Sequence, residues 1–127
     1  MVNMRAFFVT ALVAASLFAA HPALADTPSG ALTLSRSVDG RGHTVATLFC
    51  DPDGGTHTTP KQACDLLRSI GGDLGKLVHN PGVICTKEYL PHRVTAFGTW
   101  EGKPVRYTRT FGNRCEMIAV TGALFNF

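Results

Sequence analysis

Beyond its first 25 residues, the chain has no apolar run of the roughly 20 residues that a membrane-spanning helix needs. The one long apolar run, residues 6–20, comes after Arg5 and before Ala23-Leu24-Ala25, a small-x-small pattern typical of signal-peptidase cleavage sites. We therefore expect residues 1–25 to be a signal peptide and residues 26–127 to be a secreted domain with no membrane anchor. A retained N-terminal anchor is the alternative.

Clustered charge of one sign is also lacking. The chain has 12 Lys and Arg against 9 Asp and Glu, a net charge of +3, and the basic residues are scattered along it. Proteins that bind nucleic acid usually concentrate their basic residues in one patch or stripe. The sequence therefore predicts no nucleic-acid partner.

Local signatures of catalysis are missing as well. The chain has no G-x-S-x-G elbow, P-loop or glycine-rich dinucleotide pattern, and no pair of carboxylates stands out. The histidines after the signal peptide, His43, His57, His79 and His92, lie in or beside polar segments, where solvated side chains are the simpler interpretation. We expect no enzyme and no cofactor. A small secreted hydrolase of the ribonuclease type is the alternative function.

Four cysteines are present, and an even number in a small exported domain indicates a disulfide framework. They are Cys50, Cys64, Cys85 and Cys115. Three pairings are possible, and Cys50–Cys64 with Cys85–Cys115 is favoured because it joins neighbouring segments without crossing. A zinc site is the alternative, but neither C-x-x-C nor H-x-x-x-H occurs to seed one, so we expect no metal.

Alternation of apolar and polar residues predicts four strands, at residues 32–35, 44–50, 94–100 and 105–111. The apolar C-terminal segment, residues 123–127, is expected to be a fifth. In the second strand, Val45, Thr47 and Phe49 should share one face, and Ala46, Leu48 and Cys50 the other. Residues 51–57 are rich in Gly and Asp and are expected to form a loop.

One helix is clearly indicated. Thr59-Pro60-Lys61-Gln62 has the form of a capping box with proline at the first helical position. Apolar residues then recur at helical spacing until Gly71-Gly72, which favours a helix end. Together these patterns predict an α+β domain: a five-stranded antiparallel sheet with one main helix, and room for a short second helix, packed on it, with two disulfides.

Residues 83–91 look extended, and Lys87 lies among them, two residues after Cys85. Such a segment could enter a protease cleft as an added strand, with the lysine in a pocket that carries a carboxylate. A loop held in its bound shape would avoid the entropy cost of ordering on binding. Composition and spacing alone favour the alternative, an ordinary surface lysine, because exposed lysines are common.

Three runs of residues reverse this preference for an ordinary surface lysine. They are Cys85-Thr86-Lys87-Glu88-Tyr89-Leu90-Pro91, Gly98-Thr99-Trp100-Glu101-Gly102-Lys103 and Tyr107-Thr108-Arg109-Thr110-Phe111-Gly112-Asn113-Arg114-Cys115-Glu116-Met117. In these runs, and in the order and spacing of its cysteines, the chain resembles the Streptomyces subtilisin inhibitor family. The similarity continues upstream through Leu48-Phe49-Cys50-Asp51-Pro52 and covers nearly the whole predicted mature chain.

The resemblance implies a secreted, homodimeric inhibitor of subtilisin-like and sometimes trypsin-like serine proteases, with the disulfide pairing favoured above. It aligns the reactive bond with Lys87–Glu88 and assigns Asn113 to bracing the loop from behind. The residues expected to contact the protease are Ile84, Cys85, Thr86, Lys87, Glu88, Tyr89 and Leu90.

Two residues depart from the founding inhibitor of that family. Thr86 replaces a proline, so the stiffness of the loop should depend more on the disulfide and on Asn113. Lys87 replaces a methionine, which makes trypsin-like enzymes plausible targets, while its aliphatic stem still suits a broad subtilisin pocket.

Overall fold

A computed structural model describes residues 15–22 and 27–127. Most of the predicted signal peptide, including the expected cleavage region, lies outside the described residues, in segments 1–14 and 23–26. Residues 15–22 have no helix or strand. Among the described residues, no helix has both the length and the apolar character needed to cross a membrane.

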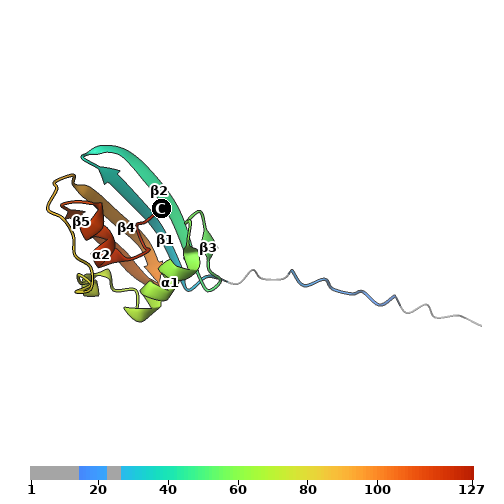
Figure 1. The fold of residues 1–127 in the computed structure, drawn as a ribbon. Helices are drawn as coiled ribbons and strands as arrows, with labels where there is room; N and C mark the ends of the chain where they lie inside the picture. The colour runs from blue at the N-terminus through green and yellow to red at the C-terminus, as the bar shows by residue number, and fades with distance from the viewer. Residues whose placement is uncertain (1–14, 23–26) are drawn as a thin grey trace, which may run out of the picture.

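A single antiparallel sheet of five strands forms the centre of the fold, in the order β3-β2-β1-β4-β5 (Figure 1). The strands are β1 (Gly30–Val38), β2 (Arg41–Cys50), β3 (Gly54–Gly55), β4 (His92–Trp100) and β5 (Lys103–Phe111). The β1–β2 hairpin turns at Asp39-Gly40 and the β4–β5 hairpin at Glu101-Gly102, and all four of these residues have positive φ. Asp-Gly and Glu-Gly therefore supply the backbone conformation that a tight two-residue turn requires.

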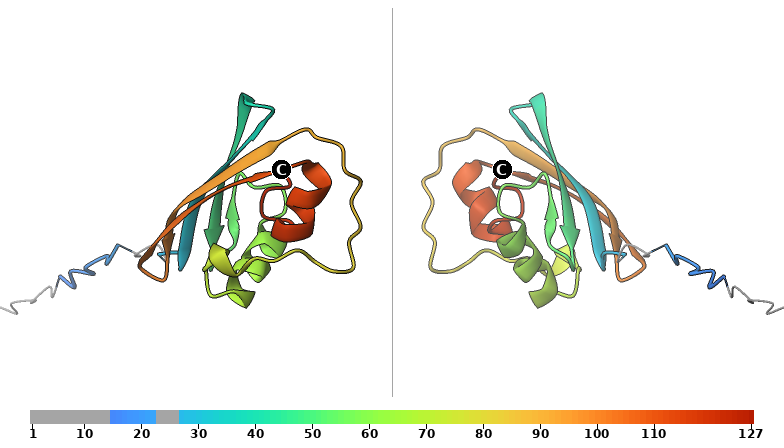
Figure 2. Two further views of the ribbon diagram at one scale, coloured as in Figure 1. Left: turned by 90° about the vertical axis from the view of Figure 1, so that its left-hand side faces the viewer. Right: turned by 90° about the vertical axis from the view of Figure 1, so that its right-hand side faces the viewer.

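The helices α1 (Pro60–Ser69) and α2 (Arg114–Thr121) and the short 3₁₀ helix η1 (Leu74–Lys76) all lie on one side of the sheet (Figure 2). The core fills the space between this side of the sheet and the helices. Its largest fully buried side chains include Leu34, Leu48, Leu67, Met117, Leu124 and Phe125. The predicted α+β class, the five-stranded antiparallel sheet and the main helix are thus confirmed, and α2 is the short second helix.

The alternation predicted for the second strand is confirmed in β2. Ala46, Leu48 and Cys50 point into the core, whereas Val45 is 57% exposed on the opposite side of the sheet. Because the helices cover only the inner side, Phe97 of β4 is likewise 57% exposed on the outer side. Within the described part of the chain, nothing covers this outer side of the sheet.

Helix α1 begins at Pro60 as predicted, but the capping-box interpretation is wrong. The Thr59 side chain makes no capping hydrogen bond, and the Thr59 backbone N–H instead donates to Nδ1 of His57 at 3.0 Å. The end of the helix follows the prediction, since Gly71 and Gly72 both have positive φ. At Gly72 an added Cβ would lie 2.3 Å from Cγ of Trp100, so the close packing of this turn on the sheet also requires glycine.

The prediction of a C-terminal strand at residues 123–127 is wrong, and the fifth strand is Gly54–Gly55, inside the segment that was expected to be a loop. Leu124 and Phe125 are fully buried, so the apolar pattern did indicate burial. The backbone carbonyls of this segment bond to side chains from elsewhere: that of Leu124 accepts from His57 and that of Phe127 from Arg36. An apolar run can be buried beside a sheet without joining its hydrogen-bond ladder.

Candidate functional site

The chain between η1 and β4, residues 77–91, has neither helix nor strand and bows outward around α2 (Figure 2). Several of its apolar side chains are turned to solvent: Ile84 is 95% exposed and Tyr89 81% exposed, whereas Leu77 at its start is buried in the core. Thr86, Lys87 and Glu88 between them are exposed as well. These exposed apolar side chains are candidates for contact with a partner.

Both ends of this loop are fixed to the body of the protein. The Cys85–Cys115 disulfide ties it to the first turn of α2, with 5.7 Å between the two Cα atoms. On the other side, the Leu90 N–H donates to the Gly112 carbonyl at 2.8 Å, and the Asp39 N–H donates to the Pro91 carbonyl at 2.7 Å. Only a few residues around Lys87 stand between these attachments.

Asn113 holds this short stretch from behind. Its side chain is 2% exposed, and its Nδ2 donates to the carbonyl oxygens of Thr86 and Glu88, each at 3.0 Å. Its Oδ1 accepts from the Glu116 N–H at 2.9 Å, which makes Asn113 the N-cap of α2. The same amide therefore starts a helix and turns the two carbonyls beside Lys87 inward.

Lys87 is left facing solvent by this arrangement. In the part of the chain that the structure describes, its ammonium makes no ion pair and its carbonyl accepts no hydrogen bond. An exposed side chain and an unengaged carbonyl on a fixed, extended backbone leave this residue able to pair with the main chain of a partner. The structure thus brings together the predicted loop residues and Asn113, which is 26 positions away from Lys87 in the sequence.

Glu116 also supports the loop, and this role was not predicted from the sequence. Oε2 of Glu116 accepts from the Gly112 N–H at 3.2 Å, and the Gly112 carbonyl in turn receives the Leu90 N–H. The spacing of Asn113 and Glu116, with a cap residue three positions before a glutamate, is the capping-box signature. No helix was predicted at these residues from this signal.

The histidines do not form a catalytic arrangement among the described residues. His57 and His92 are buried, so the expectation that they are solvated is wrong. Nε2 of His57 lies 3.0 Å from the Leu124 carbonyl, and its Nδ1 accepts from the Thr59 N–H. Nδ1 of His92 faces the Leu90 carbonyl at 2.8 Å. These rings join backbone segments together rather than activate a nucleophile.

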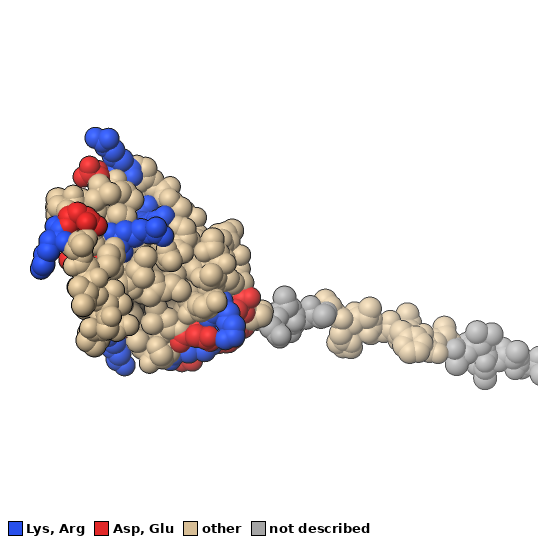
Figure 3. All heavy atoms as spheres, in the orientation of Figure 1, with Lys and Arg blue, Asp and Glu red and all other residues tan. Residues whose placement is uncertain are grey.

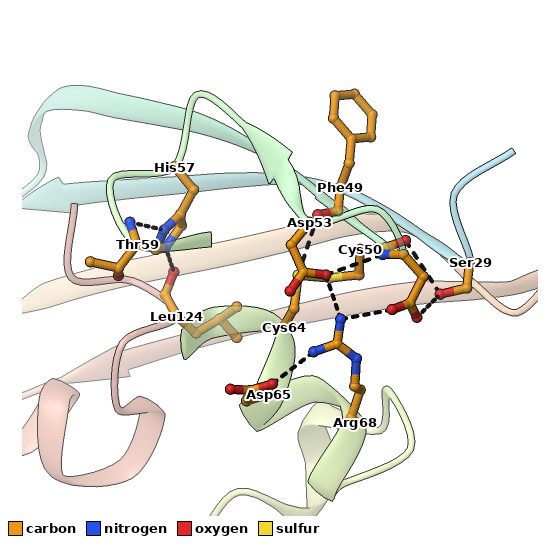
Figure 4. The surroundings of a disulfide bond; sticks show 11 residues. Ser29, Phe49, Cys50, Asp53, His57, Thr59, Cys64, Asp65, Arg68 and Leu124 are labelled. Atoms are coloured by element: carbon orange, nitrogen blue, oxygen red, sulfur yellow. Dashed lines mark hydrogen bonds and ion pairs between the residues drawn. A yellow bond between two sulfur atoms is a disulfide. The ribbon is translucent and has the colours of Figure 1, made fainter. Parts of the chain in front are cut away.

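The second disulfide, Cys50–Cys64, lies beside a group of ion pairs (Figure 4). Arg68 contacts Asp51, Asp53 and Asp65, and the Ser29 hydroxyl donates to Asp51 at 2.6 Å. The Ser29 hydroxyl first, and then Arg68, lower the pKa of Asp51 below its ordinary value.

Neither this group of charges nor the disulfide beside it forms a ligand site. Cys50, Cys64 and Asp53 lie within reach of one another, but the two sulfurs are bonded together and so are not thiolate ligands for a metal. On the face shown in Figure 3, acidic and basic side chains are interspersed rather than separated into patches. The charged groups here stabilise the fold.

The fold and the loop define a class of protein: a small disulfide-linked α+β domain with an exposed, extended loop that is fixed at both ends. The chain belongs to the subtilisin inhibitor-like family, which it matches over residues 28–113. This family consists of protease inhibitors, so the predictions of the family and of a non-enzyme are both confirmed. Both predicted disulfides are present in the structure.

Individual relatives agree with this placement. Subtilisin inhibitor-like protein 1 of Streptomyces cacaoi is 38% identical over 98 residues, covering 75% of this chain and 89% of its own. A trypsin inhibitor of Streptomyces longisporus is 48% identical over 84 residues, covering 65% of this chain and 58% of its own.

A solved structure is similar as well. Streptomyces caespitosus sermetstatin, crystallised in complex with Bacillus licheniformis subtilisin, superimposes with a TM-score of 0.61 at 32% identity. The superposition covers 76% of this chain and 97% of sermetstatin. The fold and the family are therefore shared over most of the described domain.

Proposed function

We propose that this protein is a secreted inhibitor of subtilisin-like and trypsin-like serine proteases, and that residues 84–90 enter the protease active site as a substrate would. The bond presented for attack is Lys87–Glu88. The observation that carries this proposal is the pair of hydrogen bonds from Asn113 to the carbonyls of Thr86 and Glu88, on a loop tied down by the Cys85–Cys115 disulfide. The similarity to a protein solved in complex with subtilisin supports it.

Inhibition follows from how the two sides of the Lys87–Glu88 bond are held. A protease that attacks the Lys87 carbonyl releases the amine of Glu88, which in a free peptide would diffuse away. Here the Glu88 carbonyl accepts a hydrogen bond from Asn113, and the Leu90 N–H beyond it donates to the Gly112 carbonyl. The amine stays in place and can re-form the bond, so the complex persists instead of turning over.

Lys87 would determine which proteases bind tightly. Its exposed ammonium matches a pocket with a carboxylate at its base, as in trypsin-like enzymes, and its four-carbon stem can pack in a wider apolar pocket. On the acyl side, Ile84, Cys85 and Thr86 would pair with the enzyme main chain. Tyr89 and Leu90 would contact it beyond the reactive bond.

Titration of active-site-calibrated trypsin and subtilisin with the oxidised mature protein tests this proposal. A sharp break near one chain per enzyme, with slow cleavage located at Lys87–Glu88 by mass spectrometry, is the expected result. Full protease activity at a tenfold excess of correctly disulfide-bonded protein would contradict it. Rapid, complete cleavage at the loop would equally contradict it, because the protein would then be a substrate.

We also propose that the protein is a homodimer that uses the outer side of the sheet. Val45, Phe49 and Phe97 are exposed there, on strands that no described helix covers. Thr33 of β1 pairs with Thr47 and with Phe97, so small polar residues separate the apolar ones on this side. An uncovered sheet surface with exposed apolar groups suits packing against a second copy related by a two-fold axis.

Light scattering coupled to gel filtration tests the dimer. The wild-type protein is expected to elute at twice the mass of the chain, and Phe97→Arg at the mass of one chain. Val78→Arg, at an exposed apolar residue outside the sheet, is the matched control and should stay dimeric. A monomeric wild type at micromolar concentration would overturn this proposal.

The protein would be secreted after removal of residues 1–25 as a signal peptide, and the mature chain would begin near Asp26. Arg5, the apolar run 6–20 and Ala23-Leu24-Ala25 support this. N-terminal sequencing of the protein recovered from culture medium is the test. A cell-retained product that still begins at Met1 would contradict it.

A further inference from the structure

Besides the contacts from Asn113, the loop contains a bond between two of its own side chains. Oγ1 of Thr86 donates to Oε2 of Glu88 at 2.6 Å, and both residues are exposed. Lys87 lies between them, so this bond spans the Lys87–Glu88 peptide. It joins the acyl side of the proposed reactive bond to its leaving side without using the body of the protein.

We infer that Thr86 and Glu88 are positioning residues that hold the two sides of the Lys87–Glu88 bond together and so favour the intact loop over the cleaved one. This inference rests on the proposed function. We call the pair of residues the Thr86–Glu88 clasp. Asn113 holds the backbone carbonyls of these two residues from inside the protein, whereas the clasp joins their exposed side chains, so the two restraints act on different groups.

The clasp matters once the peptide bond is broken. Attack of the protease serine hydroxyl on the Lys87 carbonyl carbon forms an ester, and the C–N bond breaks with transfer of a proton to the Glu88 nitrogen. Resynthesis reverses these steps: the Glu88 amine attacks the ester, the peptide bond forms and the serine hydroxyl is released. A bond from Thr86 to Glu88 shortens the range over which that amine can move, and so raises its effective concentration at the ester.

Hydrolysis is the competing outcome. Water then takes the place of the amine, and the products are a Lys87 carboxylate and a Glu88 ammonium on a chain still joined by Cys85–Cys115. The ratio of cleaved to intact protein at equilibrium is a property of the inhibitor alone, because a catalyst does not alter it. This ratio therefore reports the clasp without any contribution from protease contacts to Thr86 or Glu88.

In the experiment, each oxidised variant is incubated with a catalytic amount of trypsin, once starting from intact protein and once from cleaved protein. Incubation continues until both samples reach the same cleaved-to-intact ratio. Thr86→Val removes the hydroxyl but keeps the branched shape, and we expect it to raise the cleaved-to-intact ratio about fivefold. Thr86→Ser keeps the donor and should stay within about twofold of the wild type. Since the clasp is one exposed hydrogen bond, the intact Thr86→Val variant should stay folded, with a thermal midpoint lowered by no more than the few degrees that losing one such bond accounts for.

A double-mutant cycle with Glu88→Ala isolates the bond itself. In the Glu88→Ala background, Thr86→Val should no longer alter the ratio, because the acceptor is already gone. Equal effects of Thr86→Val in both backgrounds, or no effect in the wild type, would overturn the clasp while wild-type inhibition leaves the proposed function standing. A wild type that neither inhibits trypsin nor is cleaved at Lys87–Glu88 would overturn both.

Discussion

Asn113 donates to the carbonyl oxygen of Thr86 at 3.0 Å, across 27 positions of the sequence. The same side-chain Nδ2 donates a hydrogen bond to the Glu88 carbonyl, and Oδ1 of Asn113 caps α2. One buried residue thereby connects the exposed loop to the element that supports it. Predictions about the loop follow from separating these two roles.

Asn113→Asp separates bracing from capping. The carboxylate can still accept from the Glu116 N–H, so α2 keeps its cap, but it has no hydrogen to donate to the two loop carbonyls. We expect the loop to be cleaved faster and inhibition to weaken, with a helix content close to the wild type by circular dichroism. Asn113→Ala loses both roles and should also lower the free energy of unfolding by about 1–2 kcal/mol. Wild-type cleavage rates for both variants would contradict the bracing role.

Lys87→Gly tests the identity of the reactive bond. Removing the side chain that would fill the acidic pocket should weaken trypsin inhibition about 100-fold or more, as expected for an anchor residue worth about 3 kcal/mol. Subtilisin inhibition should fall less, since it depends on the aliphatic stem and the backbone. Lys103→Gly, at an exposed lysine that begins β5, is the control. If both variants inhibit trypsin equally well, Lys87 is not the specificity residue.

The two disulfides should differ in their effect on function. The Cys50–Cys64 disulfide joins residues 14 positions apart and the Cys85–Cys115 disulfide residues 30 positions apart. On the chain-entropy model, removing either disulfide lowers the free energy of unfolding by about 3–4 kcal/mol. Only Cys85→Ser/Cys115→Ser frees the loop, so only this variant should become a substrate that trypsin cleaves rapidly. Cys50→Ser/Cys64→Ser should still titrate trypsin at temperatures where it remains folded. Urea unfolding and inhibition assays on both variants provide the comparison.

The ion pairs around Arg68 predict a dependence of stability on pH. Lys61 first, with Arg68, lowers the pKa of Asp65, and Ser29 and Arg68 lower that of Asp51. Because these folded-state pKa values lie below the unfolded value of about 3.9, the unfolded chain binds protons first as the pH falls. The stabilisation is therefore complete well above pH of about 4 and is lost as the pH drops through the lower folded-state values.

Arg68→Gln should flatten this acid limb of the stability curve, measured by urea unfolding between pH of about 2 and 6. Arg106→Gln removes an exposed arginine that has no ion pair among the described residues, and is the control. An unchanged acid limb in Arg68→Gln would show that these pairs do not contribute.

His57 predicts a stability effect that its position in a polar segment did not suggest. Its ring joins the Thr59 N–H to the Leu124 carbonyl and meets the Phe127 ring edge-on at 5.5 Å. His57→Ala leaves both backbone groups without this partner and should lower the free energy of unfolding by about 2–3 kcal/mol. His79→Ala, at an exposed histidine, should leave it within about 0.5 kcal/mol. Equal stabilities for the two variants would contradict this role.

How much could be predicted varied with the range of the interaction. Local patterns predicted α1 from Pro60 and the hairpin strands, because proline, glycine and alternation constrain neighbouring residues directly. Local patterns were not enough to predict the site. They predicted that Lys87 lies in an extended segment, but only the family resemblance distinguished it from an ordinary surface lysine. The N-cap signal of α2 was present in the sequence as Asn113 and Glu116, but no helix was predicted at these residues.

The sequence by itself determined which segments are apolar on one face, where the helix α1 begins and ends, and that four cysteines occur in a chain with a signal-like start. Only the tertiary structure decided that residues 123–127 are buried without pairing as a strand, that Gly54–Gly55 joins β2, and that Asn113 meets the loop. The physical reason is that periodicity reports burial and local backbone geometry. Which distant groups satisfy a buried donor or carbonyl is determined only when the chain has packed.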